Sequence, residues 1–331
     1  MKNFLLRNNS LDKFINKINY YVSNNLKFFA LIDFLGRNII VEELNNLQNI
    51  PICYDFNGFT NFQYFESDLK KISIEKKPLS YEEYLKVFKK VQAKEEKGES
   101  YLINLTFATP IKINMTLKEI FNLSKAKFKI LYDDYFVCFS PERFVKIVEN
   151  KIYSYPMKGT RKIHTFDEAK YLTLDEKEKA EHVTIVDLIR NDIGIISTKV
   201  ETTKFMYIDI LQTNEGLIAQ TSSEIVGHLP LDWKNNFGEL LFSLLPAGSI
   251  TGAPKKRTIE IILENENYNR GFYTGVAGIY DGANFDSCVL IRFIEKTNNG
   301  YLFKSGGGIT IYSDPKKEYQ ELIDKIYAPI Y

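Results

Sequence analysis

Two glutamates near the C-terminus have a spacing that could hold a cation. Glu318 and Glu321 lie in a segment whose apolar residues recur at helical spacing, and both fall at the margin of its apolar face. Carboxylates three residues apart repel each other mildly unless a cation sits between them. The alternative is a solvated stripe in which Glu321 pairs with Lys325. Taken by itself, the pattern favours the second interpretation.

Glu181 lies in a more demanding place. It begins the segment EHVTIVDLIRND, whose apolar residues cover most of a helix surface and predict a helix buried nearly all round. A carboxylate on that helix needs a partner, because burying an unpaired charge is very costly. Mg²⁺ is one candidate, since it takes carboxylate oxygens and keeps waters and a ligand oxygen. An internal salt bridge to a distant lysine is the other, and Glu181 alone does not decide between them.

Lys158 and two glycine-rich segments could meet a substrate. Lys158 follows the strand-like run KIYSYP and is either a solvated charge or a positioned amine. Gly306, Gly307 and Gly308 allow close approach to the backbone and could form an anion-binding nest, or else a bulge or bend. The segment GSITGAPKK lacks the phosphate-loop pattern, which excludes that kind of nucleotide site. It predicts a helix start capped by Thr251, or an anion site at a helix N-terminus.

Composition narrows the class of protein. The 331 residues carry 43 Lys and Arg against 42 Asp and Glu, so no net field favours nucleic acid or a membrane surface. Cys53, Cys138 and Cys288 are far apart and in no CxxC pair, which argues against disulfides and a zinc site. No apolar run reaches the roughly 18 residues of a membrane helix, and the N-terminus lacks signal-peptide features. We expect a soluble cytoplasmic protein.

The elements that must position these residues do not alternate regularly. Patterning predicts helices over about 81–99, 166–189 and 315–326, and a further helix after GSITGAPKK. Strand candidates include YLINLTFATPI, KFKILYDDYFVCFS, RFVKIVE, KIYSYP, SSEIVGHLP and the hairpins of the C-terminal third. This order favours an α+β fold with mostly antiparallel sheets. Residues 1–75 are expected to form a short N-terminal segment packed on the same core as a main domain of residues 76–331.

Seven motifs in order resemble one family, the chorismate-utilising enzymes. They are SPERF (140–144), PMKGTR (156–161), EHVTIVDLIRNDIG (181–194), GSITGAPK (248–255), SCVLIRF (287–293), GGGI (306–309) and EYQELIDK (318–325). The resemblance implies an α+β fold of two packed antiparallel sheets wrapped by helices, with Mg²⁺ and chorismate in a central cleft. PMKGT is similar to the PIKGT of aminodeoxychorismate synthases, whereas anthranilate synthases carry PIAGT.

The resemblance also implies roles for individual residues. Lys158 would attack C2 of chorismate, and Glu142 would act as the general acid for the departing C4 hydroxyl. Glu181, Glu318 and Glu321 would bind Mg²⁺. The positions expected to hold the substrate are Thr160, Thr251, Tyr273, Arg292, Lys325 and the backbone of Gly306, Gly307 and Gly308.

Departures from related enzymes sharpen the expected reaction. Leu102 stands where isochorismate and salicylate synthases need a lysine to activate water, which disfavours water addition. Gln220 stands where anthranilate synthases have a histidine implicated in pyruvate elimination. We therefore expect amination of chorismate at C4 by ammonia, giving 4-amino-4-deoxychorismate for 4-aminobenzoate and folate synthesis. The ammonia would come from a separate glutamine amidotransferase subunit. The alternatives are anthranilate synthase component I and a non-catalytic chorismate-binding homologue.

Overall fold

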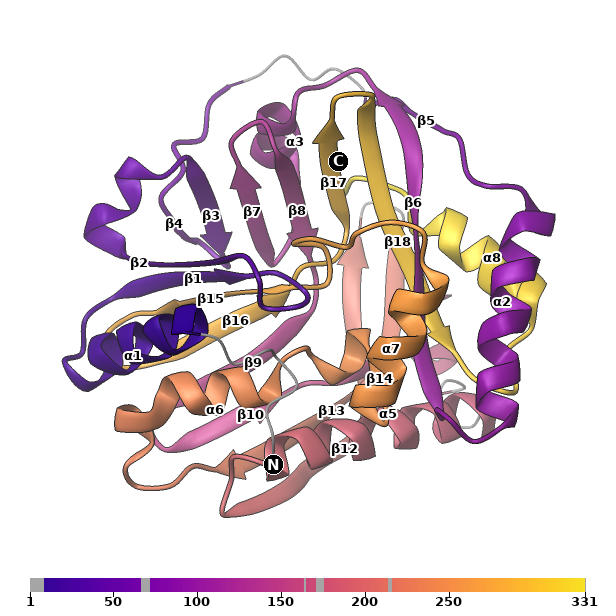
Figure 1. The fold of residues 1–331 in the computed structure, drawn as a ribbon. Coiled ribbons are helices and arrows are strands. Elements are labelled where there is room, and N and C mark those ends of the chain that lie inside the picture. The colour runs from indigo at the N-terminus through magenta and orange to yellow at the C-terminus, as the bar shows by residue number, and fades with distance from the viewer. Residues whose placement is uncertain (1–8, 67–71, 164, 171–175, 214–215, 331) are drawn as a thin grey trace.

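Two antiparallel sheets form the centre of the molecule (Figure 1). The computed structural model describes residues 9–66, 72–163, 165–170, 176–213 and 216–330. In the first sheet, the strands are β1 (Phe28–Ile32), β2 (Ile39–Glu43), β9 (Arg143–Val148), β10 (Lys151–Ser154), β11 (Met157–Ile163), β12 (Lys199–Thr213), β13 (Gly216–His228), β15 (Val276–Tyr280) and β16 (Phe285–Val289). In the second, they are β3 (Ile52–Phe56), β4 (Phe59–Thr60), β5 (Ile74–Lys76), β6 (Leu102–Ile113), β7 (Phe128–Tyr132), β8 (Phe136–Ser140), β14 (Gly252–Ala253), β17 (Phe293–Thr297) and β18 (Gly300–Ile309).

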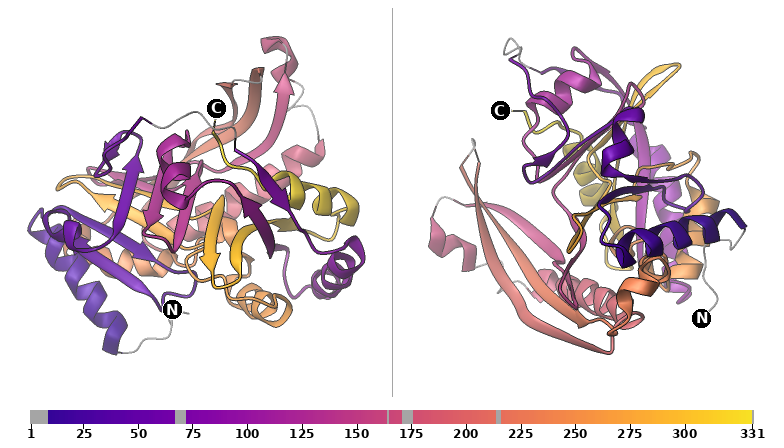
Figure 2. Two further views of the ribbon diagram at one scale, coloured as in Figure 1. Left: turned by 90° about the horizontal axis from the view of Figure 1, so that it is seen from above. Right: turned by 90° about the vertical axis from the view of Figure 1, so that its left-hand side faces the viewer.

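Helices cover the outer surfaces of the sheets. They are α1 (Asn9–Ser23), α2 (Tyr81–Glu96), α3 (Leu117–Leu123), α5 (Glu176–Gly194), α6 (Phe237–Leu244), α7 (Lys255–Asn265) and α8 (Pro315–Asp324), with 3-10 turns η1 (Leu44–Asn49), η2 (Phe166–Lys170), η3 (Trp233–Asn236) and η4 (Gly248–Ile250). Figures 1 and 2 show α2 beside α8 at one edge of the second sheet, and the long hairpin β12–β13 at an edge of the first. The predicted α+β class with antiparallel sheets is confirmed. No helix in the described part of the chain is long and apolar enough to cross a membrane.

A shared aromatic core joins the two sheets. Phe29 of β1 and Cys288 of β16 pack in the same cluster as Phe136 of β8 and Phe293 of β17. The rings of Phe136 and Phe293 stack with centroids 4.5 Å apart. The N-terminal segment takes part in both sheets, because β1 pairs with β15 and β3 pairs with β7. The relative position of the sheets is therefore fixed by burial of large apolar side chains.

Helix ends follow local sequence signals. Ser80 and Glu83 form a reciprocal capping box at the start of α2, and Asp314 accepts hydrogen bonds from two backbone N–H groups at the start of α8. The predicted helix over 81–99 ends at Glu96, where Gly98 takes a φ of +72° that few other residues adopt. The predicted cap at Thr251 is wrong, because α7 has Pro254 as its N-cap.

The region around the predicted second helix departs further from expectation. Residues 166–170 form the turn η2, and the α-helix runs from Glu176 through the RNDIG segment to Gly194 rather than ending at Ile189. Burial of Ile193, which is 1% exposed, accounts for the extension. The segment Met157–Ile163, which contains a charged run, is strand β11 and pairs with β13. Residues 164 and 171–175 lie outside the described part.

Candidate active site

Three charged side chains, two from α8 and one from the residue that follows it, converge on one glycine of β18. A Cβ atom placed on Gly307 would lie 3.4 Å from Glu318 Oε2, 3.8 Å from Glu321 Oε1 and 3.7 Å from Lys325 Nζ. Lys325 Nζ is 2.6 Å from Glu321 Oε1 and donates to the Gly306 carbonyl at 2.8 Å. The i,i+4 ion pair considered from the sequence is therefore present. The pair of Glu321 and Lys325 lies beside the Glu318 carboxylate at Gly307, rather than on an isolated solvated stripe.

Helix α8 is held against β18 by its buried face. Leu322 is 3% exposed within the large core cluster, and its carbonyl accepts a hydrogen bond from Ser305 Oγ at 3.1 Å. Tyr319 donates its hydroxyl to the Leu79 carbonyl at 2.8 Å. Because both ends of this face are tied down, the carboxylates on the adjoining stripe are carried to Gly307.

The three glycines form neither a nest nor a bulge. They lie inside β18 in unbroken antiparallel register with β6, where Gly306 faces Thr106 and Gly308 faces Asn104. The backbone N–H of Thr106 donates to Glu266, and that of Asn104 donates to the Thr251 carbonyl, so neither is directed at β18. Antiparallel residues that face each other without exchanging hydrogen bonds point their backbone groups outward. The N–H groups of Gly306 and Gly308 therefore point away from β6.

This outer edge of β18 is open to a ligand beyond Lys304. The pairing of β17 with β18 ends at Lys304, and the Gly306 carbonyl on this edge meets Lys325 instead. The missing side chains also serve packing. A Cβ on Gly306 would come within 2.3 Å of the Leu105 carbonyl, and one on Gly308 within 3.0 Å of the Leu102 side chain. Glycine at these two positions therefore lets β6 approach closely, while the outward N–H groups remain on the open edge.

Glu142 is positioned by the turn between β8 and β9. Its Oε1 accepts a hydrogen bond from Ser249 Oγ at 2.6 Å, and its backbone N–H donates to Ser140 Oγ at 3.1 Å. Burial raises the pKa of Glu142 above its ordinary value, while the Ser249 bond and the charges of Lys325 and Arg292 oppose the increase. A carboxyl with a raised pKa can be protonated near neutral pH, as a general acid requires.

Arg292 presents an unused hydrogen-bond donor. It lies just before β17 with a φ of +55°, and its Nη1 donates to the Lys325 carbonyl at 3.5 Å. Its Nε is buried and has no hydrogen-bond partner among the described residues. Tyr273 is also buried, and its pKa is raised by burial and lowered in part by Arg270 and Arg292. A carboxylate ligand would satisfy the open guanidinium position.

Two cavities connect the motifs. A cavity of about 120 Å³ is lined by Glu142, Met157, Ile185, Asp192 and Ser249, among others. A larger cavity of about 560 Å³ is lined by Leu102, Glu181, Ile185 and Gly308 together with the end of α2. Ile185 of α5 borders both. The first cavity therefore places Glu142 beside β11, the strand that carries Lys158, and the second places Glu181 beside Gly308 of β18.

The remaining predicted residues are placed as follows. The backbone of Lys158 pairs with Thr221 and that of Thr160 with Gln220, but the side chains of Lys158 and Thr160 lie outside the described part. Gln220 donates to the Met157 sulfur at 3.2 Å, next to Lys158. Thr251 is fully buried and donates its hydroxyl to the Ala247 carbonyl at 2.8 Å. In this conformation, the hydroxyl of Thr251 stabilises the turn.

The carboxylates have the chemistry of a magnesium site. Glu318 and Glu321 meet at Gly307, and Glu181 lines the cavity that Gly308 also lines. Oxygen ligands of this kind suit Mg²⁺, so the donor set fits the ion. Within the described residues, no three His, Cys, Asp or Glu side chains are already gathered closely enough to hold a metal ion. Lys325 is the present partner of Glu321.

Two residues of this region were not predicted from the sequence. Ser249 is the hydrogen-bond donor to Glu142, and its place in GSITGAPK was the only signal. Glu95 lies in the wall of the larger cavity. It follows Val91 by four residues on the buried face of α2, a spacing that could have revealed it.

Comparisons with known proteins agree with this geometry. Residues 53–331 match the family described as chorismate binding enzyme. An uncharacterized PabA-like protein of Haemophilus influenzae is 44% identical over 97% of this chain and 98% of its own length. Aminodeoxychorismate synthase component 1 of Bacillus subtilis is 32% identical over 76% of this chain, which spans 55% of that relative.

A solved structure extends the likeness to three dimensions. Anthranilate synthase component I from Streptococcus pneumoniae superposes with a TM-score of 0.64 at 26% identity, covering 79% of this chain and 60% of the other. The family match covers most of the chain and includes all seven motifs. The chain belongs to the family of chorismate binding enzymes, and within it resembles aminodeoxychorismate synthase component 1.

Proposed function

We propose that the protein aminates chorismate at C4 with ammonia, in the manner of aminodeoxychorismate synthase component I. One observation carries the proposal: the buried carboxyl of Glu142 lines a cavity that strand β11, to which Lys158 belongs, also borders. The product would be 4-amino-4-deoxychorismate, a precursor of 4-aminobenzoate and folate. The similarity to aminodeoxychorismate synthase component 1 supports the same assignment.

The proposed reaction uses a lysine and a carboxylic acid in sequence. The neutral amine of Lys158 attacks C2, the two conjugated ring double bonds both shift, and the C4–oxygen bond breaks. Glu142 donates its proton to the departing hydroxyl, which leaves as water. Ammonia then forms a bond to C4, the bond between Lys158 and C2 breaks, and Glu142 recovers a proton from the nitrogen. Chorismate and ammonia thereby give the aminated product and water.

The substrate carboxylates are assigned to the opposite side of the site. Arg292 offers its open Nε, and Gly306 and Gly308 offer outward N–H groups. Glu181, Glu318 and Glu321 would hold Mg²⁺, which would anchor the ring carboxylate and offset its charge. Glu321 Oε1 is now paired with Lys325 Nζ, and with Mg²⁺ bound to Glu321 the side chain of Lys325 would be available to a substrate carboxylate.

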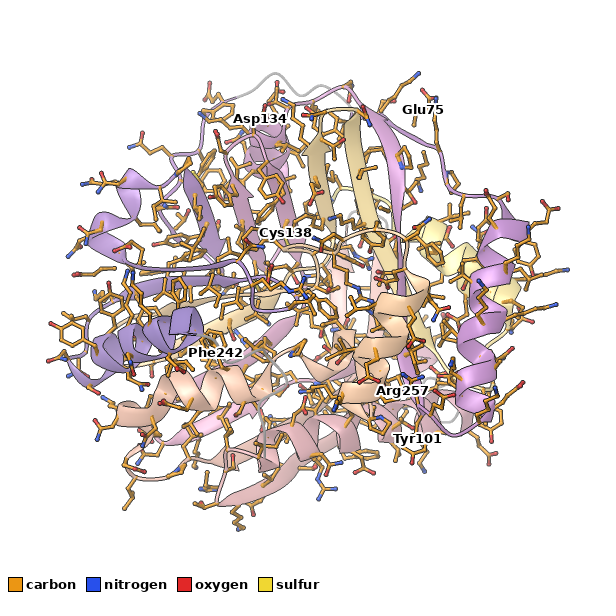
Figure 3. The ribbon with its side chains drawn as sticks, viewed as in Figure 1. Glu75, Tyr101, Asp134, Cys138, Phe242 and Arg257 are labelled. Carbon is orange, nitrogen blue, oxygen red and sulfur yellow. The ribbon has the colours of Figure 1, made fainter. Side chains whose placement is uncertain are left out.

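Ammonia is assigned to a separate glutamine amidotransferase. Hydrolysis of glutamine by that class of enzyme uses a cysteine thiolate. Burial raises the pKa of the Cys53, Cys138 and Cys288 thiols, which is opposite to the lowered pKa that a nucleophilic cysteine needs. Figure 3 shows Cys138 in the interior of the molecule. Free ammonium should replace the partner in an assay.

The product distinguishes this proposal from its alternatives. The purified chain is incubated with chorismate, Mg²⁺ and ammonium chloride, and the products are separated and identified by mass. We expect 4-amino-4-deoxychorismate that retains the pyruvyl group. Anthranilate with free pyruvate would instead identify a lyase. If no turnover occurs with ammonium or with added amidotransferase, the chain is a chorismate-binding homologue without this activity.

A further inference from the structure

A buried carboxyl interrupts the apolar face of α2. The face consists of Tyr84, Phe88 and Val91, and Glu95 continues it at the next helical turn. Glu95 is 4% exposed, and neither of its carboxyl oxygens has a hydrogen-bond partner among the described residues. A buried carboxylate without a partner is strongly destabilised relative to one in water. The position therefore calls for a neutral carboxyl or for a ligand that donates hydrogen bonds.

The cavity beside this residue opens to the surface and reaches the candidate active site. Glu95 lines the cavity of about 560 Å³, and so do Glu181 and Gly308. Tyr101 and Tyr312 also line it and are exposed, so that the cavity meets solvent between them. Figure 3 shows Tyr101 at the lower end of α2, close to α5. The cavity therefore joins the surface at Tyr101 and Tyr312 to both Glu95 and Gly308 of β18.

The charge of the cavity indicates the class of ligand. Glu95 and Glu96 of α2 contribute two carboxyl groups to its wall, and no Lys, Arg or His is among the described residues that line it. Arg257 of the neighbouring helix α7 is paired with Glu99 and Glu260, and Lys94 also lies beside Glu99. Arg257 and Lys94 therefore already have carboxylate partners other than Glu95. A cationic ligand would supply both the positive charge and the hydrogen-bond donors that Glu95 lacks.

We propose that Glu95 binds an ammonium ion at this cavity and accepts its proton, so that neutral ammonia passes to the substrate. This inference rests on the proposed function, which requires ammonia as the nucleophile. In the step, one N–H bond of ammonium breaks, an O–H bond forms on Glu95, and the electron pair remains on nitrogen. Glu95 then returns the proton to water at the mouth between Tyr101 and Tyr312.

The environment of Glu95 suits this exchange. Burial alone raises the pKa of its carboxyl to about 8, which brings it nearer to that of an amine than an ordinary carboxyl would be. Transfer of a proton between groups of similar pKa requires little free energy. A single buried carboxyl also matches a monovalent, hydrogen-bonding ion better than a divalent metal, which takes several oxygen ligands.

The test compares Glu95→Gln with Glu96→Gln. Glu96 lines the same cavity but is exposed, which makes it a matched control. With ammonium chloride as the amine source, Glu95→Gln should raise the KM for ammonium about 10- to 100-fold, as expected for loss of a charged hydrogen bond. The KM for chorismate should stay within about twofold for both variants, since neither residue is assigned to chorismate. An unchanged KM for ammonium in Glu95→Gln, or an equal rise in both KM values, would overturn the assignment.

A binding measurement separates this site from the proposed function. Ammonium chloride should raise the melting temperature of the wild-type chain more than an equal concentration of sodium chloride, because it binds the folded state. Glu95→Gln should lose the difference, and Glu95→Leu, which restores the apolar stripe, should lose it as well. If this dependence on Glu95 is seen but no aminated product forms, the ammonium site stands and the proposed function fails. If the product forms and ammonium gives no Glu95-dependent stabilisation, the site is wrong.

Discussion

Replacing Gly307 of β18 by alanine should weaken ligand binding with little effect on folding. In Gly307→Ala, the new methyl group lies 3.4 Å from Glu318 Oε2, 3.7 Å from Lys325 Nζ and 3.8 Å from Glu321 Oε1. These are ordinary van der Waals contacts. Alanine also restricts the unfolded chain more than glycine does, so we expect the free energy of unfolding to change by less than about 1 kcal/mol. The methyl group nevertheless occupies space between the carboxylates and the strand.

Binding should respond differently from folding. The ligand and Mg²⁺ must share the space around Gly307 with the methyl group, and we expect their affinity to fall at least about tenfold, or roughly 1.4 kcal/mol. Gly306→Ala is the contrasting variant, because its Cβ would lie 2.3 Å from the Leu105 carbonyl. Overpacking against backbone should destabilise the fold by about 1–3 kcal/mol or more.

Two measurements on each variant separate an effect on folding from an effect on ligand binding. Denaturant unfolding gives the free energy of unfolding, and calorimetric titration with Mg²⁺ in the presence of chorismate gives the affinity. If Gly307→Ala binds Mg²⁺ and chorismate as tightly as wild type, the space at Gly307 is not the ligand site. If Gly306→Ala is as stable as wild type, β6 does not approach Gly306 as closely as the structure indicates.

Three further predictions concern single side chains. Lys158→Ala should abolish most amination while chorismate still binds, and wild-type turnover by this variant would exclude the covalent step. In Ser249→Ala, the pKa of Glu142 should rise, because the hydrogen bond from Ser249 opposes protonation of the carboxylate. The decrease of kcat/KM with increasing pH should therefore occur at higher pH than in wild type. A decrease at the same or a lower pH would contradict the role of Glu142 as the acid. For Glu95, the folded state binds the proton more tightly than the unfolded state, so stability is highest below the ordinary pKa of 4.5 and declines up to about pH 8. At about 1.4 kcal/mol per pKa unit, the full decline is up to about 5 kcal/mol. Denaturant unfolding across this range should show Glu95→Leu with a smaller decline, and equal declines in both proteins would indicate that Glu95 is not the cause.

Local patterns in the sequence predicted some elements well. The start of α8 was visible in Asp314 and Pro315, and the structure places Asp314 as the cap with Pro315 in the first turn. The strand candidate KFKILYDDYFVCFS is extended as expected, but it consists of two strands, β7 and β8, joined by a turn in which Asp133 takes a φ of +45°. Such features depend on a few neighbouring residues, so a single sequence contains the information.

Features that depend on distant residues were not predictable in this way. Whether Gly306–Gly308 form a nest or a strand depends on β6, which lies about two hundred residues earlier in the chain. The contact between Ser249 and Glu142 joins segments more than one hundred residues apart. The motif resemblance named most of the residues that meet here, but the unpaired Glu95 is visible only once α2 is packed against its neighbours.

Mass spectrometry of a trapped adduct shows whether Lys158 forms a covalent bond to chorismate. The chain is mixed with chorismate and Mg²⁺ in the absence of ammonia, denatured rapidly, digested and examined by mass spectrometry. The mass of the peptide containing Lys158 should increase by that of chorismate less one water, and ammonium should remove the adduct as product appears. An unmodified Lys158 peptide throughout turnover, together with full activity of Lys158→Ala, would contradict the covalent step.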